Sequence, residues 1–252
     1  MILHVACLPF PTHQGTQAAV AAMLDASAAS GRHVELLTYA QSGYALDTRY
    51  EVHRIPDFPK VRSLRSGPSW GKLALDARCI LEIRRLAKLR QPHAIIAHHI
   101  EAGAAALAAR VAPVYYVAHT SLQHELPVYL PLLPSGIVSE VSRRVERTLC
   151  QGAAGVAAVA PSLAALLGRG TKYLPVPWPI PLGAPAEPAE ARRSLGIASE
   201  ARVCLYAGNL DPYQGWEHLI EALAVLRRSL PGARLLIATE SDPRPVYAEA
   251  AL

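Results

Sequence analysis

Two apolar runs with the length and composition of buried strands, His93–His99 and Val114–Ala118, each end in polar residues that could bind a ligand. These residues are His98, His99, Glu101, His119, Thr120 and Ser121. In an open α/β sheet, ligands bind beyond the carboxyl ends of the strands, so both groups are expected at one crevice. His119 is the main candidate among them, although a histidine that only caps a loop or bonds to the backbone would give the same pattern.

A metal site is not predicted from these histidines. His119 and His124-Glu125 do not have the His-Glu-x-x-His spacing, and the proline-rich residues after them do not favour a helix. His98 and His99 are neighbours on a predicted strand, so their side chains are expected to point to opposite faces. No cofactor is predicted, because neither strand–helix turn carries the G-x-G-x-x-G fingerprint of dinucleotide binding.

The stretch Arg202–Leu230 predicts a second place for ligand chemistry. Val203–Ala207 is typical of a buried strand, residues 208–212 form a turn by composition, and a helix begins near Gly215. The apolar stripe of that helix is Trp216, Leu219, Ile220, Leu223, Leu226 and Leu230. Free N–H groups and the positive end of the helix dipole can bind a phosphate at such a turn, although most strand–turn–helix units bind nothing.

This stretch resembles the start of the C-terminal domain of family 4 glycosyltransferases. The matching positions are Gly208, Leu210, Asp211, Pro212, Gly215, Leu219, Ile220 and Ala222. The resemblance implies a GT-B-like α/β fold of two facing Rossmann-like domains. It also implies a retaining transferase that moves a hexose from a nucleotide-diphospho-sugar, bound mainly by the second domain, to a glycan or lipid-linked acceptor on the first.

The same resemblance implies roles for individual residues. His119 is the predicted catalytic residue, because a histidine at the end of this strand helps to position the sugar in the family. Gly15 and Thr16 match a Gly-containing loop that contacts donor or acceptor, although a glycine required only by a tight turn explains Gly15 equally well. The other predicted binding residues are His98, Glu101, Thr120, Gly208, Asn209, Gln214 and Gly215.

Three features depart from the family pattern. Asn209 and Gln214 stand where the turn often carries Arg and Lys, and neutral donors stabilise a leaving diphosphate less than cations do. Thr239–Pro243 replaces a glycine-rich turn, and the paired glutamates that bind the donor sugar and ribose do not occur before Leu252. The second domain is therefore expected to be incomplete. A non-catalytic module for a nucleotide-sugar, a glycolipid or a partner chain stays open as an alternative, and an epimerase of similar architecture is a third.

The chain is predicted to have three regions. They are a Rossmann-like domain over 1–176, a proline-rich linker with a short helix over 177–200, and the start of a second α/β domain over 201–252. Further strands are expected at Ile2–Leu8, His33–Tyr39, Tyr50–Ile55, Gly155–Ala160, Lys172–Val176 and Arg234–Thr239.

Helices are expected from Gly15 to the stop at Gly31, from Trp70, over Glu101–Val111, over Ser135–Cys150, from Pro161 and over Ala189–Ile197. The helix from Trp70 is expected to turn Leu73, Ala77, Ile80, Ile83 and Ala87 inward. The helix over Ser135–Cys150 carries Ile137, Val141, Val145 and Leu149 on one face. Gln123–Pro134, with three prolines, is predicted to be a long mobile loop near the cleft.

Composition favours a globular chain of more than one domain. Its 252 residues are 51% hydrophobic, and the mean hydropathy is +0.17. No apolar run approaches the ~18–20 residues of a membrane span, and the first ten residues lack the basic start of a signal peptide. Cys7, Cys79, Cys150 and Cys204 form no Cys-x-x-Cys pair, which favours a reduced, cytoplasmic protein.

The net charge of +5 is concentrated in a basic belt from Arg54 to Arg90, where ten Lys or Arg stand against three acids. The few aromatic residues there argue against a nucleic-acid partner. The belt is compatible with peripheral contact to an anionic membrane, such as the inner membrane face, or with a phosphorylated substrate. A solvated Arg-rich surface explains it equally well.

Overall fold

The computed structural model describes residues 1–12, 14–40, 43, 45, 47–56, 70–176, 186–211, 214–239 and 241–250. Its internal contacts divide the chain into two compact units, Met1–Pro179 (unit 1) and Ile180–Leu252 (unit 2). Among the described residues, no helix has both the length and the apolar character needed to cross a membrane.

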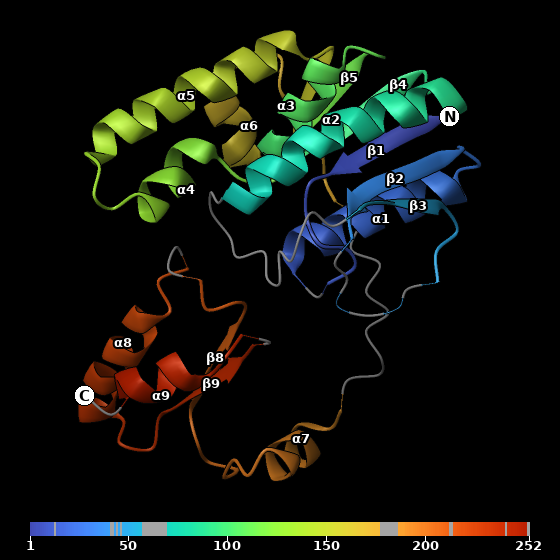
Figure 1. Ribbon diagram of the computed structural model, residues 1–252. Coiled ribbons are helices and arrows are strands. Elements are labelled where there is room, and N and C mark those ends of the chain that lie inside the picture. The colour runs from blue at the N-terminus through green and yellow to red at the C-terminus, as the bar shows by residue number, and fades with distance from the viewer. Residues whose placement is uncertain are drawn as a thin grey trace. The chain divides into compact units, whose positions relative to one another are not determined.

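Unit 1 is organised around a seven-stranded sheet in the order β3-β2-β1-β4-β5-β6-β7 (Figure 1). The strands are β1 (Ile2–Ala6), β2 (Val34–Tyr39), β3 (Glu51–Ile55), β4 (Ala94–His98), β5 (Val114–Ala118), β6 (Gly155–Ala158) and β7 (Lys172–Tyr173). Every pairing is parallel. The predicted α/β architecture is therefore present, with β1, β6 and β7 shorter than expected. The strand order reverses between β1 and β4, which is the switch point of a doubly wound sheet.

Helices cover both faces of this sheet. Leu3 and Val5 of β1 pack in one core cluster with α2 (Trp70–Arg90) and α3 (His99–Ala109). Ala6 packs in a second cluster with α1 (Gly15–Ala29). A third cluster joins β5 to α5 (Ser135–Gly152) and α6 (Pro161–Leu167). Because the central strands are buried on both faces, they read in the sequence as continuous apolar runs.

The predicted inward face of α2 is only partly correct. Ile83 is fully buried, but Leu73 is 57% exposed and Ala77 is exposed. The buried stripe is Leu75, Cys79, Ile83 and Leu86, which has equally good helical spacing. Cys79 lies against Cys7 in the core, with a distance of 3.6 Å between the two sulfur atoms.

The predicted loop Gln123–Pro134 is largely a helix, α4 (Leu122–Tyr129), with Pro127 inside it. A proline leaves the carbonyl four residues earlier, that of Gln123, without its helical partner. The Ser139 hydroxyl of α5 donates a hydrogen bond to this carbonyl at 3.0 Å. The loop prediction was wrong because a side chain from the next helix satisfies the group that the proline leaves unpaired.

Helix α5 does not bury the apolar face that the sequence predicted. Ile137, Val141 and Val145 are 64%, 53% and 47% exposed, and only Leu149 of that face is buried. The buried face carries Val138, Ser142, Glu146 and Leu149. The Glu146 carboxylate explains which face is buried, because it accepts hydrogen bonds from the Leu122 backbone N–H (2.8 Å) and the Ser121 hydroxyl (3.2 Å). Glu146 thereby joins α5 to the start of α4.

Unit 2 contains the predicted strand–turn–helix–strand arrangement. Strand β8 (Val203–Ala207) pairs in parallel with β9 (Arg234–Ala238), and the helices are α7 (Pro188–Ser194), α8 (Glu217–Ser229) and α9 (Arg244–Ala250). The expectation that β8 is buried is wrong for the described residues, since Leu205 is 65% exposed and Cys204 is exposed. The predicted stripe of α8 is also only partly covered, although Trp216 just before it is buried. A sheet of two strands offers little surface against which these side chains can pack.

Two predicted regions lie largely outside the described residues. Residues 57–69, in the first half of the basic belt, are one of them, and residues 177–185 of the proline-rich linker are the other.

Replacing Glu146 by alanine is expected to destabilise unit 1 by about 2–4 kcal/mol. The change leaves the Leu122 N–H and the Ser121 hydroxyl without an acceptor in a largely buried position. Urea unfolding monitored by circular dichroism measures the effect.

Glu140→Ala is the matched control, because Glu140 lies on the same helix but forms exposed ion pairs with Arg143 and Arg144. We expect its loss to cost much less than the loss of Glu146, because exposed ion pairs contribute little to stability. Equal losses for the two variants would contradict the structural role of Glu146.

Candidate functional site

The polar residues predicted at two strand ends lie at the switch point of the sheet. Strands β1 and β4 pair with Ala6 opposite His98, and β4 and β5 pair with His98 opposite Val117. Helix α1 then covers one face of the sheet and α3 the other, so the carboxyl ends of these strands are where a doubly wound fold binds its ligand. A chain of contacts joins four residues of this edge, from Thr16 to His99, from His99 to His119 and from His119 to His98.

His98 lies at the centre of a row of three histidines. A hydrogen bond of 3.1 Å joins its Nδ1 to Nε2 of His119, and one of 3.0 Å joins its Nε2 to Nδ1 of His4. His98 and His4 are 0% and 1% exposed, whereas His119 is partly exposed. Of the three, His119 is therefore the ring that a ligand can reach.

His99 contacts the same site from another direction. The strand ends at His98, and His99 is the first residue of α3 with a φ of 69°. Its Nε2 lies 3.3 Å from the Thr16 hydroxyl, and its ring stacks on His119 with centroids 5.1 Å apart. The prediction that His98 and His99 point to opposite faces was wrong, because the chain leaves the strand between them.

Burial keeps these histidines neutral. It lowers the pKa of His4 to about 4. Burial, and then the neighbouring His99, lowers the pKa of His119 to about 3. The pKa of His98 is lowered by burial and further by His4, His119 and His99. At neutral pH the row can therefore offer N–H groups and lone pairs to a ligand, but no positive charge.

Glu101, in the first turn of α3, is the nearest predicted carboxylate. Its Oε1 accepts a hydrogen bond from Lys72 Nζ at 2.9 Å, and its side chain is 30% exposed. Burial by itself would raise the pKa of Glu101, but Lys72 and the His99 ring outweigh it, so the pKa is lowered. The charge of Lys72 is thus neutralised next to the site.

Thr120 follows β5 and is partly exposed. Its hydroxyl bonds to Glu125 of α4. The pKa of Glu125 is raised, chiefly by burial and with help from the charges of Glu101 and Glu146, although the Thr120 bond opposes this. Glu125 is consequently easier to protonate than an exposed glutamate.

Gly15 is the first residue of α1, and nothing lies within 4 Å of the place where a Cβ would stand. The structure therefore gives no crowding around Gly15 that would require a glycine. Gly15 stays a predicted binding residue.

Sequence reasoning did not identify His4, Lys72, Glu125 and Glu146 as parts of this edge. His4 is a polar residue inside an otherwise apolar strand, and that was the signal available for it. The other three reach the site from helices α2, α4 and α5, and their partners cannot be found by spacing in the sequence.

The predicted turn of unit 2 is described except for residues 212–213. A Cβ on Gly208 would stand 2.9 Å from the Tyr206 hydroxyl, and Gly215 has a φ of +63°, so both positions favour glycine. The Asn209 side-chain oxygen accepts a hydrogen bond from the Asp211 N–H at 3.2 Å. The Gln214 side chain is exposed just before α8.

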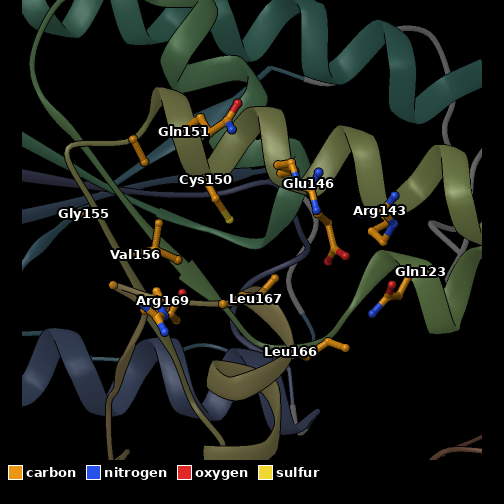
Figure 2. A pocket seen from close by; sticks show the side chains of 15 residues that line it. Gln123, Arg143, Glu146, Cys150, Gln151, Gly155, Val156, Leu166, Leu167 and Arg169 are labelled. Carbon is orange, nitrogen blue, oxygen red and sulfur yellow. The ribbon is translucent and has the colours of Figure 1, made fainter.

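A pocket of about 600 Å³ lies elsewhere in unit 1, between α5, β6 and α6 (Figure 2). Its charged lining residues are Arg143, Glu146, Arg147 and Arg169. It contains none of the predicted site residues, and the Glu146 carboxylate is already bonded to Ser121 and Leu122. We therefore place the candidate site at the histidine row and not in this pocket.

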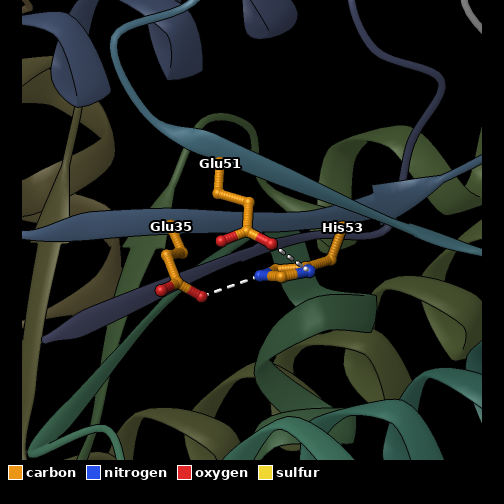
Figure 3. A group of neighbouring side chains, drawn as sticks. All are labelled: Glu35, Glu51 and His53. Atoms are coloured by element: carbon orange, nitrogen blue, oxygen red, sulfur yellow. Dashed lines mark hydrogen bonds and ion pairs between the residues drawn. The ribbon is translucent and has the colours of Figure 1, made fainter. Parts of the chain in front are cut away.

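A second group of ionisable residues lies near the amino ends of β2 and β3 (Figure 3). Glu35, Glu51 and His53 each offer a ligand atom, and these atoms lie within 4.8 Å of one another. Arg90 already supplies positive charge there, because its Nη2 lies 2.7 and 2.9 Å from the Glu51 oxygens. The group is best explained as an ion network that joins the end of α2 to the sheet.

Solved structures with this fold include several sugar-processing enzymes. A sucrose-phosphate synthase from Thermosynechococcus elongatus is 19% identical, with a TM-score of 0.74, and the match covers 96% of this chain and 63% of that chain. WaaG, a glycosyltransferase involved in lipopolysaccharide biosynthesis, is 17% identical, with a TM-score of 0.69, and the match covers 100% of this chain and 66% of that chain. The catalytic domain of starch synthase IV from Arabidopsis thaliana, bound to ADP and acarbose, is 15% identical, with a TM-score of 0.66, and the match covers 98% and 70%.

These matches confirm the predicted GT-B-like fold class. The chain spans less than two thirds of the length of the first two proteins. No curated protein matches it in sequence. The family model of the glycosyl transferase 4-like domain matches residues 14–177, which is more than half of the chain. The chain therefore belongs to the glycosyl transferase 4-like family, as its resemblance to family 4 glycosyltransferases predicted.

Proposed function

We propose that this chain acts in the transfer of a hexose from a nucleotide-diphospho-sugar to a glycan or lipid-linked acceptor. The family match over residues 14–177 is the observation that carries the proposal. Residues 1–176 are proposed as the acceptor-side domain, 177–200 as the linker, and 201–252 as part of the nucleotide-sugar side. Family membership also favours transfer over the epimerase alternative.

His119 is proposed to hold the sugar during transfer. Its support is threefold: it is the partly exposed end of the histidine row, it is neutral, and it lies at the switch point of the sheet. Thr16, Glu101 and Thr120 stand around it on α1, α3 and the end of β5. His98 is fully buried, so we assign it the role of holding His119. We assign no nucleophile to any carboxylate of the chain.

The turn of unit 2 is proposed to bind the leaving diphosphate. Its residues Gly208, Asn209, Gln214 and Gly215 precede the N-terminus of α8, where free N–H groups and the helix dipole favour an anion. Asn209 and Gln214 add neutral donors, which bind an anion about half as strongly as charged ones.

A non-catalytic binding module is the second candidate function. The uncharged side chains at Asn209 and Gln214 favour it, because transfer builds up negative charge on the diphosphate. Such a module would bind a nucleotide-sugar or a glycolipid without releasing nucleoside diphosphate, which is the outcome that separates it from the transferase.

The transferase proposal predicts that His119→Ala lowers turnover about 100-fold or more, because a hydrogen bond to the reacting sugar is lost. Release of nucleoside diphosphate from UDP-, ADP- and GDP-hexoses, with a glycolipid extract as acceptor, measures this in the full natural protein. The variant should also lose about 1–3 kcal/mol of stability, because the buried His98 ring loses its partner, so circular dichroism must show that it is folded in the assay.

His53→Asn is the matched control. His53 lies on β3 in the Glu35–Glu51 ion network, at the other edge of the same sheet, and its loss should leave turnover near the unsubstituted rate. Turnover that survives in His119→Ala would remove His119 from the site. Binding of a nucleotide-hexose without any release by the unsubstituted protein would favour the binding module.

The low pKa values of the histidine row predict acid destabilisation. Between the folded values of about 3 and 4 and an unfolded value of ~6.5, the unfolded chain binds more protons, so stability falls as pH falls through this window. At pH 5.5, each of His4 and His119 should lower the free energy of unfolding by about 1–2 kcal/mol relative to pH 8.

Urea unfolding at pH 8, 6.5 and 5.5 measures this loss. In His119→Asn, the free energy of unfolding should change less between pH 8 and pH 5.5, because one of the buried rings is gone. Leu36→Ala, which removes buried volume on the strand next to His4, should lower stability without changing the slope. A pH-independent free energy of unfolding over this range would contradict the neutral, buried row.

Peripheral contact with an anionic membrane through the 54–90 basic belt remains part of the proposal, for a protein in the cytoplasm. Several belt cations already bond within the fold: Arg54 donates to the Phe10 carbonyl, Arg84 to the Ala108 carbonyl, and Lys72, Arg85 and Arg90 to carboxylates. The contact would therefore depend mainly on the other belt cations.

We expect binding to vesicles of mixed phosphatidylglycerol and phosphatidylcholine that weakens from 50 to 300 mM NaCl, measured by co-sedimentation. The triple change Lys60→Ser, Arg62→Ser and Arg65→Ser should weaken it, whereas Arg192→Ser with Arg193→Ser in α7 should not. Equal binding to pure phosphatidylcholine vesicles would refute the electrostatic contact.

A further inference from the structure

The row of hydrogen-bonded histidines His4, His98 and His119 runs across three neighbouring strands of the sheet. His4 lies in the middle of β1, His98 ends β4, and His119 follows β5. Neighbouring rings are joined by Nδ1–Nε2 contacts of 3.0 and 3.1 Å, and the ring centroids are 5.3 and 5.4 Å apart. Each contact is short enough for a full hydrogen bond.

A hydrogen bond between two neutral imidazoles needs one N–H and one lone pair. The protons of the three rings are therefore coupled. In one arrangement every Nδ1 carries the proton: His4 donates to His98, and His98 donates to His119. In the other arrangement every Nε2 carries it, and the donation runs from His119 back to His4. A neutral ring has one proton to share, so mixed arrangements break at least one of the two bonds.

The two arrangements differ at the buried end of the row. Nε2 of His4 is buried and has no hydrogen-bond partner in the described part of the chain. When every Nδ1 carries the proton, this buried atom is a bare lone pair. When every Nε2 carries it, the buried atom is an unpaired N–H. Buried N–H groups without an acceptor are rarer than under-used acceptors, and an unsatisfied buried polar group costs about 1–3 kcal/mol.

We propose that His98, held by His4, is a positioning residue that keeps the proton of His119 on Nδ1. His119 then meets its ligand as a neutral N–H donor, which suits an oxygen acceptor such as a sugar hydroxyl or a phosphate oxygen. The assignment of the tautomer depends only on the contacts among His4, His98 and His119. Only the identity of the ligand depends on the proposed function. His99, stacked on the ring and within hydrogen-bond distance of the Thr16 hydroxyl, holds the plane of His119.

The tautomers are measured directly by long-range ¹H–¹⁵N correlation on the full chain with ¹⁵N-labelled histidine at pH 7.5. The His119 signals are assigned by their loss in His119→Asn. We expect a bare Nε2 and a protonated Nδ1 for His119, and the same for His98 and His4. A His119 ring protonated on Nε2, or one that averages between the two tautomers, overturns the proposal.

Two nearly isosteric variants test whether His98 sets the tautomer. In His98→Asn, the amide can turn either its N–H₂ or its oxygen towards His119, so Nε2 of His119 should average between bare and protonated. In His98→Asp, an ionised carboxylate only accepts hydrogen bonds, so Nε2 of His119 should become protonated. If His98 merely fills space beside His119, the His119 signals should be alike in both variants, and that result overturns the proposal. If His98→Asp does not fold, the unsubstituted protein and His98→Asn still decide it.

Activity separates this inference from the proposed function. With a transferase, both variants should lower turnover, and His98→Asp should lower it about 10-fold more than His98→Asn, because only the carboxylate fixes the proton of His119 on Nε2. If the protein releases no nucleoside diphosphate but shows the expected tautomers, the transferase proposal is refuted and the inference about His98 stands. If the protein is an active transferase but His119 carries its proton on Nε2, the inference about His98 is refuted and the transferase proposal stands.

Discussion

The parallel pairing of β1 with β4 is the constraint on which unit 1 depends. Crossover connections between parallel strands are right-handed, so the chain covers both faces of the sheet only by reversing its winding once. The reversal falls at this pairing, where Ala6 stands opposite His98. Helices α1 and α3 leave the sheet towards opposite faces from there, and the carboxyl ends of β1, β4 and β5 face the crevice. The His4–His98 bond spans the same pairing, so the strand order and the orientation of His119 have one cause.

In each unit, the donors that we propose to bind the ligand are neutral groups. In unit 1 the histidines are uncharged because they are buried, and the charge of Lys72 is neutralised by Glu101. In unit 2 the side chains at the turn are Asn209 and Gln214. Neutral hydrogen bonds give less binding energy to an anion than cations do, but they impose direction and they depend little on salt. A ligand held this way is selected by the placement of its oxygen atoms more than by its total charge.

Much of unit 1 could be predicted from the sequence, because strands buried on both faces appear as unbroken apolar runs and polar residues at their ends appear as abrupt changes. His98 and His119 were predicted at the strand ends in this way, whereas Thr16 was predicted from the family resemblance. Contacts that depend on a side chain from a distant element could not be predicted. The Ser139 hydroxyl makes α4 compatible with Pro127, and Glu146 turns the apolar stripe of α5 outward. In unit 2, the elements were predicted but the burial of β8 was not, because burial depends on what packs against a strand and not on its composition.

The single buried histidine in β1 has a consequence for how sequence variation in this family is interpreted. His4 is 1% exposed and belongs to the core by every measure of position, yet it is bonded to the ring that holds His119. Substitutions at His4, His98 and His119 should therefore show epistasis, since each ring determines which proton arrangement its neighbour can adopt. Among homologues these three positions should co-vary, so that a sequence with an apolar residue at position 98 also lacks the histidine at position 4. An apparently conservative core replacement in β1 would then change ligand recognition without touching the ligand.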